Sequence, residues 1–181
     1  KAWKKGGSKM FVNVNTMVSV EDLIRGIIVQ SGNDACIAIA EGISGSEALF
    51  AEELNLLAKE IGMMNSSFTN STGWPDPDHL TTIQDLLTLT VRTIEDFPEL
   101  YYYYAEKEFT YSGIRQLNRN PLLFNEINAD GLKTGHTSLG GYGLVASVLK
   151  NNRRLILILN GLKRNKDRSN ESERLIKLGF N

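Results

Sequence analysis

The first hundred residues contain apolar stretches with helical spacing, separated by short polar breaks. Within each stretch apolar residues recur every three or four positions, and a Ser, Thr or Asp precedes it as a potential N-cap. The pattern predicts four helices, over residues 19–30, 34–42, 46–62 and 82–97. We expect Asp34 to cap the second helix, which should be buried because it is small and apolar around its circumference.

The second half of the chain is richer in residues that favour strands. The aromatic run over residues 101–111 predicts one strand, and another is expected around Lys133. Two further strands, over residues 142–150 and 153–161, should be joined by the two Asn residues at 151–152, a hairpin signal. A helix is expected to close the chain.

Two segments lack a regular pattern. Residues 1–18 are expected to be irregular or to form a hairpin. Residues 65–81 are rich in Asn, Ser, Thr, Gly and Pro and predict a long loop. Loops of this length are usually functional or well packed, and we expect Phe68 and Trp74 to attach this one to the core.

This order of elements predicts an α+β fold, in which an antiparallel sheet packs against a helical layer. The 181 residues, with 41% hydrophobic and 23% charged, suffice for one domain spanning residues 1–181. Twenty Lys and Arg against 21 Asp and Glu give a net charge of −1, which favours neither nucleic acid nor an acidic lipid surface. The longest aliphatic run, residues 155–159, is too short to span a bilayer, and the single cysteine, Cys36, excludes an internal disulfide.

A segment around Lys133 places an ammonium and a hydroxyl between Gly131 and Gly135 at an expected strand edge. Glycine lets a ligand backbone lie close because it has no Cβ, and an edge strand offers unpaired N–H and C=O groups to an extended peptide. Lys133-Thr134-Gly135 is therefore a candidate substrate-binding edge. The alternative, a strand end with a solvated lysine, is the commoner role of such a tripeptide.

A second candidate site is the turn Ser31-Gly32-Asn33 between two expected helices, whose side chains could point into a cleft. Alone, both residues are more often turn and cap residues than functional ones. The Ser-x-Asn turn and the Lys-Thr-Gly strand are two of the three motifs described for penicillin-binding proteins and serine β-lactamases.

The chain resembles the low-molecular-mass penicillin-binding proteins, the D-alanyl-D-alanine carboxypeptidases that trim peptidoglycan, and the fold expected from the resemblance is β-lactamase/transpeptidase-like. The resemblance runs from about Met10 to Phe180. The matching segments are residues 28–38, 73–79, 106–110, 118–120, 130–135, 141–147 and 171–180.

The resemblance implies catalytic roles for three residues. The Ser31 hydroxyl would relay a proton between the nucleophile and the leaving amine, and the Asn33 amide would orient the substrate backbone. Lys133 would supply positive potential and hydrogen bonding that stabilise an alkoxide and help to fix Ser31.

The resemblance also implies substrate contacts. Thr134 would bind the terminal carboxylate, Gly135 would let the substrate backbone lie close, and His136 would give its backbone N–H to the oxyanion hole while its imidazole stays exposed. Arg168, in a basic loop, matches the arginine that binds the free C-terminal carboxylate, which a planar guanidinium can grip in bidentate fashion. Solvation of that loop is the alternative.

The family's nucleophile is the serine of a Ser-x-x-Lys motif upstream of the Ser-x-Asn turn, and no such motif precedes Ser31. The one Ser-x-x-Lys string, Ser147 to Lys150, lies in an expected strand, where positions i and i+3 face opposite sides. We therefore expect a partial catalytic domain, incomplete on its N-terminal side, with apolar helix surface exposed.

Together these expectations describe a serine D-Ala-D-Ala carboxypeptidase that acts on peptidoglycan stem peptides through an acyl-enzyme and is acylated by β-lactams. It would work on the extracytoplasmic face of the membrane, tethered through a segment absent from this chain. No cofactor and no metal are expected, since the cluster at residues 76–79 matches no strong ligand pattern.

Two alternatives remain. One is a non-catalytic domain that binds wall peptides and has lost the nucleophile helix. A serine β-lactamase is less favoured, because residues 61–81 contain no glutamate for deacylation.

Overall fold

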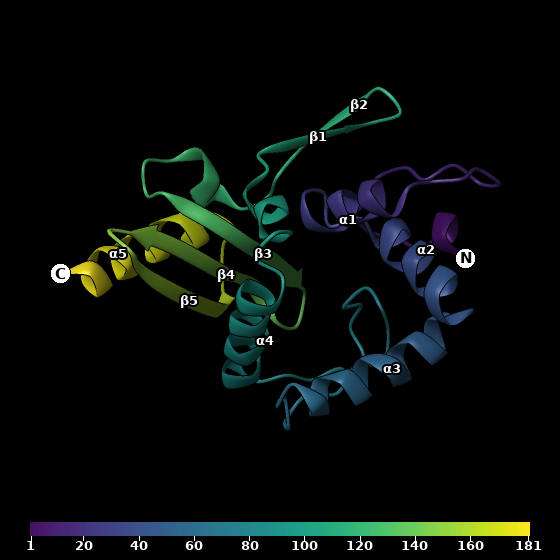
Figure 1. Cartoon of the computed structure of the whole chain (residues 1–181), viewed down its shortest axis with the longest axis horizontal. Coiled ribbons are helices and arrows are strands. Elements are labelled where there is room, and N and C mark those ends of the chain that lie inside the picture. The colour runs from purple at the N-terminus through teal and green to yellow at the C-terminus, as the bar shows by residue number, and fades with distance from the viewer.

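The computed structural model describes residues 1–181, and α1 to α3 follow an arc away from the sheet while α4 returns toward it (Figure 1). The helices are α1 (Val20–Ile28), α2 (Asn33–Ser44), α3 (Glu47–Glu60), α4 (Ile83–Asp96) and α5 (Asp167–Phe180). Short 3₁₀ helices are η1 (Ala2–Lys4), η2 (Tyr101–Ala105) and η3 (Pro121–Phe124). The strands are β1 (Glu108–Tyr111), β2 (Ile114–Leu117), β3 (Ala129–Thr137), β4 (Gly141–Lys150) and β5 (Arg153–Leu162).

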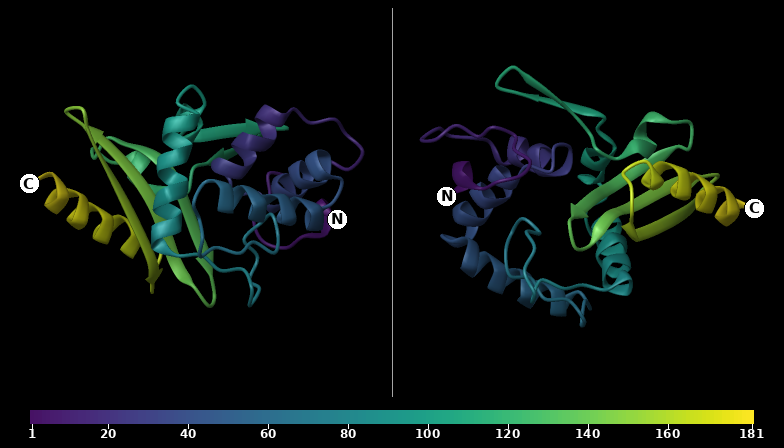
Figure 2. Two further views of the ribbon diagram at one scale, coloured as in Figure 1. Left: turned by 60° about the horizontal axis from the view of Figure 1, so that its bottom comes forward. Right: turned by 180° about the vertical axis from the view of Figure 1, so that it is seen from behind.

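The main sheet is antiparallel in the order β3-β4-β5, so β3 is an edge strand, as predicted. Helix α5 covers one face and α4 lies on the other (Figure 2). Every second residue of β4 points under α5, which is the strand period of two. The resulting apolar cluster contains Leu122, Leu144, Ala146, Val148 and Ile176.

Local signals in the sequence are confirmed at the helix starts and at the hairpin. Ser19, Ser46 and Thr82 each accept a hydrogen bond from the backbone N–H three residues on, as N-caps do. Asn151 and Asn152 both have positive φ, 51° and 59°, which a two-residue type I′ turn requires.

The prediction that Asp34 caps α2 is wrong. The helix begins one residue earlier, at Asn33, with Gly32 at the N-cap position and no side-chain cap. Asp34 is fully buried, and its carboxylate accepts hydrogen bonds from the backbone N–H groups of Met10, Phe11 and Val12 at 2.9, 2.9 and 3.0 Å. The carboxylate therefore holds the irregular N-terminal segment against α2.

The single strand expected over residues 101–111 is also wrong in its first half. Residues 101–105 form η2, whose 3₁₀ turn brings the rings of Tyr101 and Tyr104 together at 5.6 Å. The Tyr101 hydroxyl lies against Gly131, where a Cβ would approach it to 2.6 Å. The chain then extends into β1, which pairs only with β2 in a hairpin that projects from the body (Figure 1).

The loop over residues 65–81 is fixed mainly by polar side chains. Asn55 of α3 exchanges two hydrogen bonds with the Phe68 backbone, at 2.7 and 2.8 Å, and Asp85 of α4 accepts two from the start of the loop. Trp74 is 43% exposed, with the Lys5 ammonium 4.7 Å from its ring centroid. The expectation that Trp74 reaches the core is therefore wrong.

None of the helices combines the length and apolar character that a membrane crossing requires.

We expect Asp34→Ala to lower the free energy of unfolding by about 2–4 kcal/mol, because it leaves four backbone N–H groups without this acceptor, two of them buried. Urea unfolding followed by circular dichroism measures this loss. Asp76→Ala is the control, since that carboxylate accepts from only one N–H in an exposed turn. Equal stability of the two variants would contradict the anchoring role of Asp34.

Candidate functional site

A cleft of about 1280 Å³ lies where the turn before α2, the loop over residues 65–81, β3 and the start of α5 meet. Its lining includes every residue that the sequence predicted for the site: Ser31, Asn33, Lys133, Thr134, Gly135, His136 and Arg168. Three of the lining side chains are cationic, those of Arg119, Lys133 and Arg168, and none is a carboxylate. The cleft therefore favours anionic ligands.

The turn between α1 and α2 places Ser31 in the cleft. Its backbone has φ of 61°, in the left-handed region, and its N–H donates to Ile27 O at 3.1 Å. The next N–H, of Gly32, donates to Gly26 O at 2.9 Å, so both residues close the end of α1. The hydroxyl of Ser31 is 2.8 Å from Lys133 Nζ, although the residues are 102 positions apart.

Lys133 lies on the edge strand β3 and donates to two oxygens, Ser31 Oγ at 2.8 Å and Thr134 O at 3.1 Å. No carboxylate pairs with it. Burial lowers the pKa of Lys133 to about 8, and the nearby cations Arg119 and Arg168 act in the same direction. A large neutral fraction is therefore present just above neutral pH, which suits an amine that exchanges protons.

Asn33 is the first residue of α2, and its contacts fix it to the N-terminal segment. Its side-chain Nδ2 donates to Gly6 O at 2.8 Å and its backbone N–H donates to Ser8 O at 2.8 Å. The amide nitrogen is thus engaged by the protein, while Oδ1 is left as the acceptor that could face a ligand in the cleft.

The two glycines of the β3 segment have different environments. A Cβ on Gly135 would meet nothing within 4 Å, which leaves the backbone open on that side, as the sequence predicted. A Cβ on Gly131 would collide with the Tyr101 hydroxyl, so this glycine makes room for packing and not for a ligand. Thr134 is largely buried beside the open position.

His136 is exposed, as expected, but its ring has a partner. The imidazole stacks on Tyr142, its cross-strand neighbour in β4, with 4.0 Å between ring centroids. On Tyr142 lies the Arg168 guanidinium, whose Cζ is 4.9 Å from the ring centroid. These three side chains form one wall of the cleft.

Arg168 is not in a loop as predicted: it lies in the first turn of α5 and is 6% exposed. Its Nε donates to Gly143 O at 3.0 Å, Nη1 donates to Asn165 Oδ1 at 2.7 Å, and Nη2 donates to Gly135 O. The guanidinium therefore joins β3, β4 and α5, and only its remaining N–H groups are available to a ligand.

Sequence reasoning missed Arg119, a cleft cation that donates to the Ser8 hydroxyl. Its position within an Asn-Arg-Asn turn was the available signal. Cys36 also lines the cleft, and burial raises its pKa to about 11, so it is a thiol at neutral pH. Ser147, rejected as a nucleophile, is fully buried in β4 and accepts a hydrogen bond from Arg154.

Comparison with known proteins gives consistent matches. Residues 1–163 match the Peptidase S11 family, described as D-alanyl-D-alanine carboxypeptidase. A D-alanyl-D-alanine carboxypeptidase of Haemophilus influenzae is 46% identical over 99% of this chain and 47% of its own length. One of Escherichia coli is 45% identical over 97% of this chain and 44% of its length. The chain thus spans about half the length of these relatives.

Solved structures agree with the predicted fold class. Penicillin binding protein 5 from Haemophilus influenzae superposes with a TM-score of 0.93 and 46% identity, over 96% of this chain and 51% of that one. Penicillin-Binding Protein D2 from Listeria monocytogenes, in an ampicillin-bound form, gives 0.88 at 26% identity, over 98% of this chain and 74% of that one. The Streptomyces K15 DD-transpeptidase, at 21% identity, covers 96% of this chain and 72% of that one with a TM-score of 0.89, and it shares the fold.

The partly buried Lys133 predicts a pH dependence of stability. Its folded-state pKa of about 8 lies below the value of about 10.4 expected in the unfolded chain. Between these values the unfolded chain binds the extra proton, so this group makes stability rise with pH from about 8 to about 10.4. Below about pH 8 both states are protonated, and the unfavourable burial of the charge is fully present.

The free energy of unfolding, measured with urea from pH 7 to 10.5, should therefore rise less in Lys133→Met than in the wild type. Lys107→Met is the control, since Lys107 is exposed. A rise that is the same in all three proteins would rule out a depressed pKa for Lys133.

Proposed function

Because the chain belongs to the D-alanyl-D-alanine carboxypeptidase family, we propose that it supplies part of the active site of a serine D-Ala-D-Ala carboxypeptidase. The reaction would remove the terminal D-alanine from a peptidoglycan stem peptide through an acyl-enzyme. The observation that carries this proposal is the 2.8 Å hydrogen bond between Lys133 Nζ and Ser31 Oγ within an anion-favouring cleft.

In this proposal Ser31 and Lys133 transfer protons. A pKa of about 8 lets Lys133 hold or release a proton near neutral pH, and its contact with the Ser31 hydroxyl forms a path toward the leaving amine. In the protonated form, the Lys133 ammonium stabilises negative charge that develops on the attacking oxygen. Asn33 Oδ1 accepts from the substrate backbone.

The substrate would lie along the free edge of β3. Gly135 leaves its backbone open there, so an extended peptide can pair with the strand. Thr134 and the remaining N–H groups of Arg168 bind the terminal carboxylate, and the His136 N–H contributes to the oxyanion hole. The positive charge of the cleft supports a substrate with a free carboxylate end.

The nucleophile would come from a Ser-x-x-Lys segment outside these 181 residues. The one such string within them is unsuitable, since Ser147 is fully buried in β4 and Lys150 is exposed at the strand end. The relatives are about twice as long as this chain, which is consistent with a contribution from elsewhere in the protein.

The same site would react with β-lactams, which carry a carboxylate beside a strained amide. The ampicillin-bound Listeria relative supports this extension. Because peptidoglycan lies outside the cytoplasm, we propose that the protein works on the outer face of the membrane, with any tether provided by another segment. A non-catalytic wall-peptide-binding domain stays the second candidate, because no nucleophile is identified within these residues.

Acylation by a labelled penicillin separates these candidates. The protein is produced at its full encoded length and its intact mass is measured after incubation. We expect one covalent adduct, formed at least about 100-fold more slowly in Ser31→Ala and Lys133→Ala, since each removes a proton-transfer or charge-stabilising group. Lys107→Ala, which alters an exposed lysine outside the cleft, should acylate at the wild-type rate.

Release of D-alanine from a peptide ending in D-Ala-D-Ala completes the test. An intact, folded protein that forms no adduct and releases no D-alanine would sink the enzyme proposal and support the binding domain. Rapid hydrolysis of the penicillin itself, without D-alanine release, would instead indicate a β-lactamase.

A further inference from the structure

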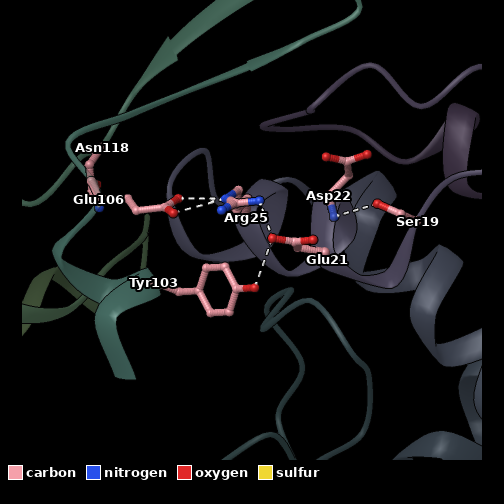
Figure 3. A network of polar contacts seen from close by, with 7 residues as sticks. All are labelled: Ser19, Glu21, Asp22, Arg25, Tyr103, Glu106 and Asn118. Carbon is pink, nitrogen blue, oxygen red and sulfur yellow. Dashed lines mark hydrogen bonds and ion pairs between the residues drawn. The ribbon is translucent and has the colours of Figure 1, made fainter. Parts of the chain in front are cut away.

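A polar network joins α1 to the segment that leads toward β3 (Figure 3). Arg25 Nε donates to both oxygens of Glu106, at 3.0 and 2.9 Å, and Nη1 donates to Glu21 Oε1 at 2.7 Å. The Tyr103 hydroxyl donates to the same Glu21 oxygen at 3.1 Å, and the guanidinium carbon lies 5.0 Å from the centroid of the Tyr103 ring. The guanidinium is thus held by two carboxylates, those of Glu106 and Glu21, and by the ring of Tyr103.

This ion pair has an unusual place in the chain. The other ion pairs lie within a helix, at the start of α5, within the β1-β2 hairpin, or within the main sheet. Arg25 and Glu106 are 81 positions apart and connect residues 1–96 with residues 101–181. Their side chains are only 24% and 21% exposed, so solvent screens the pair less than it screens a surface pair.

From Glu106 the hydrogen bonds continue to the edge strand. The Asn118 amide donates to Glu106 O at 2.9 Å, and Asn118 Oδ1 accepts from the Asn120 N–H at 2.9 Å. The Asn120 amide then donates to Gly131 O at 2.9 Å, two residues before Lys133. Both asparagines are buried. The position of β3 is therefore coupled to that of Glu106.

At its other end the network reaches the Ser31 turn. Arg25 lies in the last turns of α1, and its carbonyl accepts the Val29 N–H at 2.8 Å. The Ile27 and Gly26 carbonyls then accept from Ser31 and Gly32. A shift of α1 relative to Glu106 would therefore move Ser31 away from Lys133.

We propose that Arg25 is a positioning residue, which keeps the Ser31 hydroxyl within hydrogen-bonding distance of Lys133 by fixing α1 to Glu106. The residue touches neither substrate nor reacting atoms. The importance of Arg25 for catalysis rests on the proposed function, whereas its effect on the Ser31–Lys133 contact does not. Misplacement of a catalytic group by about 1 Å is enough to slow a reaction by about 100-fold.

The test compares Arg25→Gln with Arg115→Gln. The control removes an ion pair between two side chains of the β1-β2 hairpin, Arg115 and Glu108, which bond to each other and not to α1. NMR of lysine-labelled protein measures the Lys133 pKa directly in this chain. In Arg25→Gln we expect it to rise from about 8 toward about 10.4, because the water admitted to the ammonium outweighs the loss of its hydrogen bond to Ser31. Arg115→Gln should leave it unchanged.

The full-length protein gives a second measurement. Arg25→Gln should slow penicillin acylation about 10- to 100-fold, with its pH profile displaced to higher pH, and Arg25→Lys should restore part of the rate. Should Arg25→Gln fail to fold, Glu106→Gln breaks the same link and leaves Arg25 paired with Glu21.

A lower stability with an unchanged Lys133 pKa would overturn the proposal, since a purely structural role predicts that result. A raised Lys133 pKa in a protein that never reacts with penicillin would support positioning and count against the proposed function alone.

Discussion

A partly buried ammonium without a carboxylate partner is the constraint around which this structure is organised. Lys133 has only two oxygen acceptors, and one of them, Ser31 Oγ, comes from the turn between α1 and α2. Removing an ammonium from water is unfavourable unless its hydrogen bonds are met. The contact therefore requires Ser31 and Lys133, which are 102 positions apart in the sequence, to be held at a fixed distance. The environment that surrounds the ammonium there lowers the pKa of Lys133.

That separation is maintained by polar contacts more than by one continuous core. Ten of the twenty buried apolar residues form two separate clusters, one in which Met10 and α1 pack with Phe109 of β1 and one around Leu144 in the sheet. The cleft lies between the parts of the chain that these clusters stabilise. Charged and amide side chains such as Asp34, Arg25 and Asn120 connect segments distant in sequence, because such bonds are directional and fix both distance and orientation.

Much of the fold could be predicted because its signals are local. Capping residues such as Ser46 and the Asn pair of the hairpin act within a few positions, so the sequence reveals them. The predictions for Asp34 and Tyr101 were wrong because the partners of these residues, the Met10 segment and Gly131, are distant in the sequence. A capping residue and a buried anchor look alike until the tertiary contacts are known.

The candidate site was predictable for a different reason. Hydrophobic periodicity does not predict that Ser31 and Lys133 lie close together. That prediction rested on the resemblance to a family. Arg119 escaped notice because a charged residue in a turn is usually solvated, and only the folded chain brings it beside Ser8. The contacts of Arg168 with strand carbonyls were equally invisible in sequence.

The left-handed backbone of Ser31 sets a compromise between folding and chemistry. Glycine adopts a φ of 61° freely, whereas a residue with a Cβ is strained there by about 1–2 kcal/mol. A glycine at this position would relax the turn but remove the hydroxyl that meets Lys133. The turn therefore carries backbone strain at the one residue whose hydroxyl accepts a hydrogen bond from Lys133.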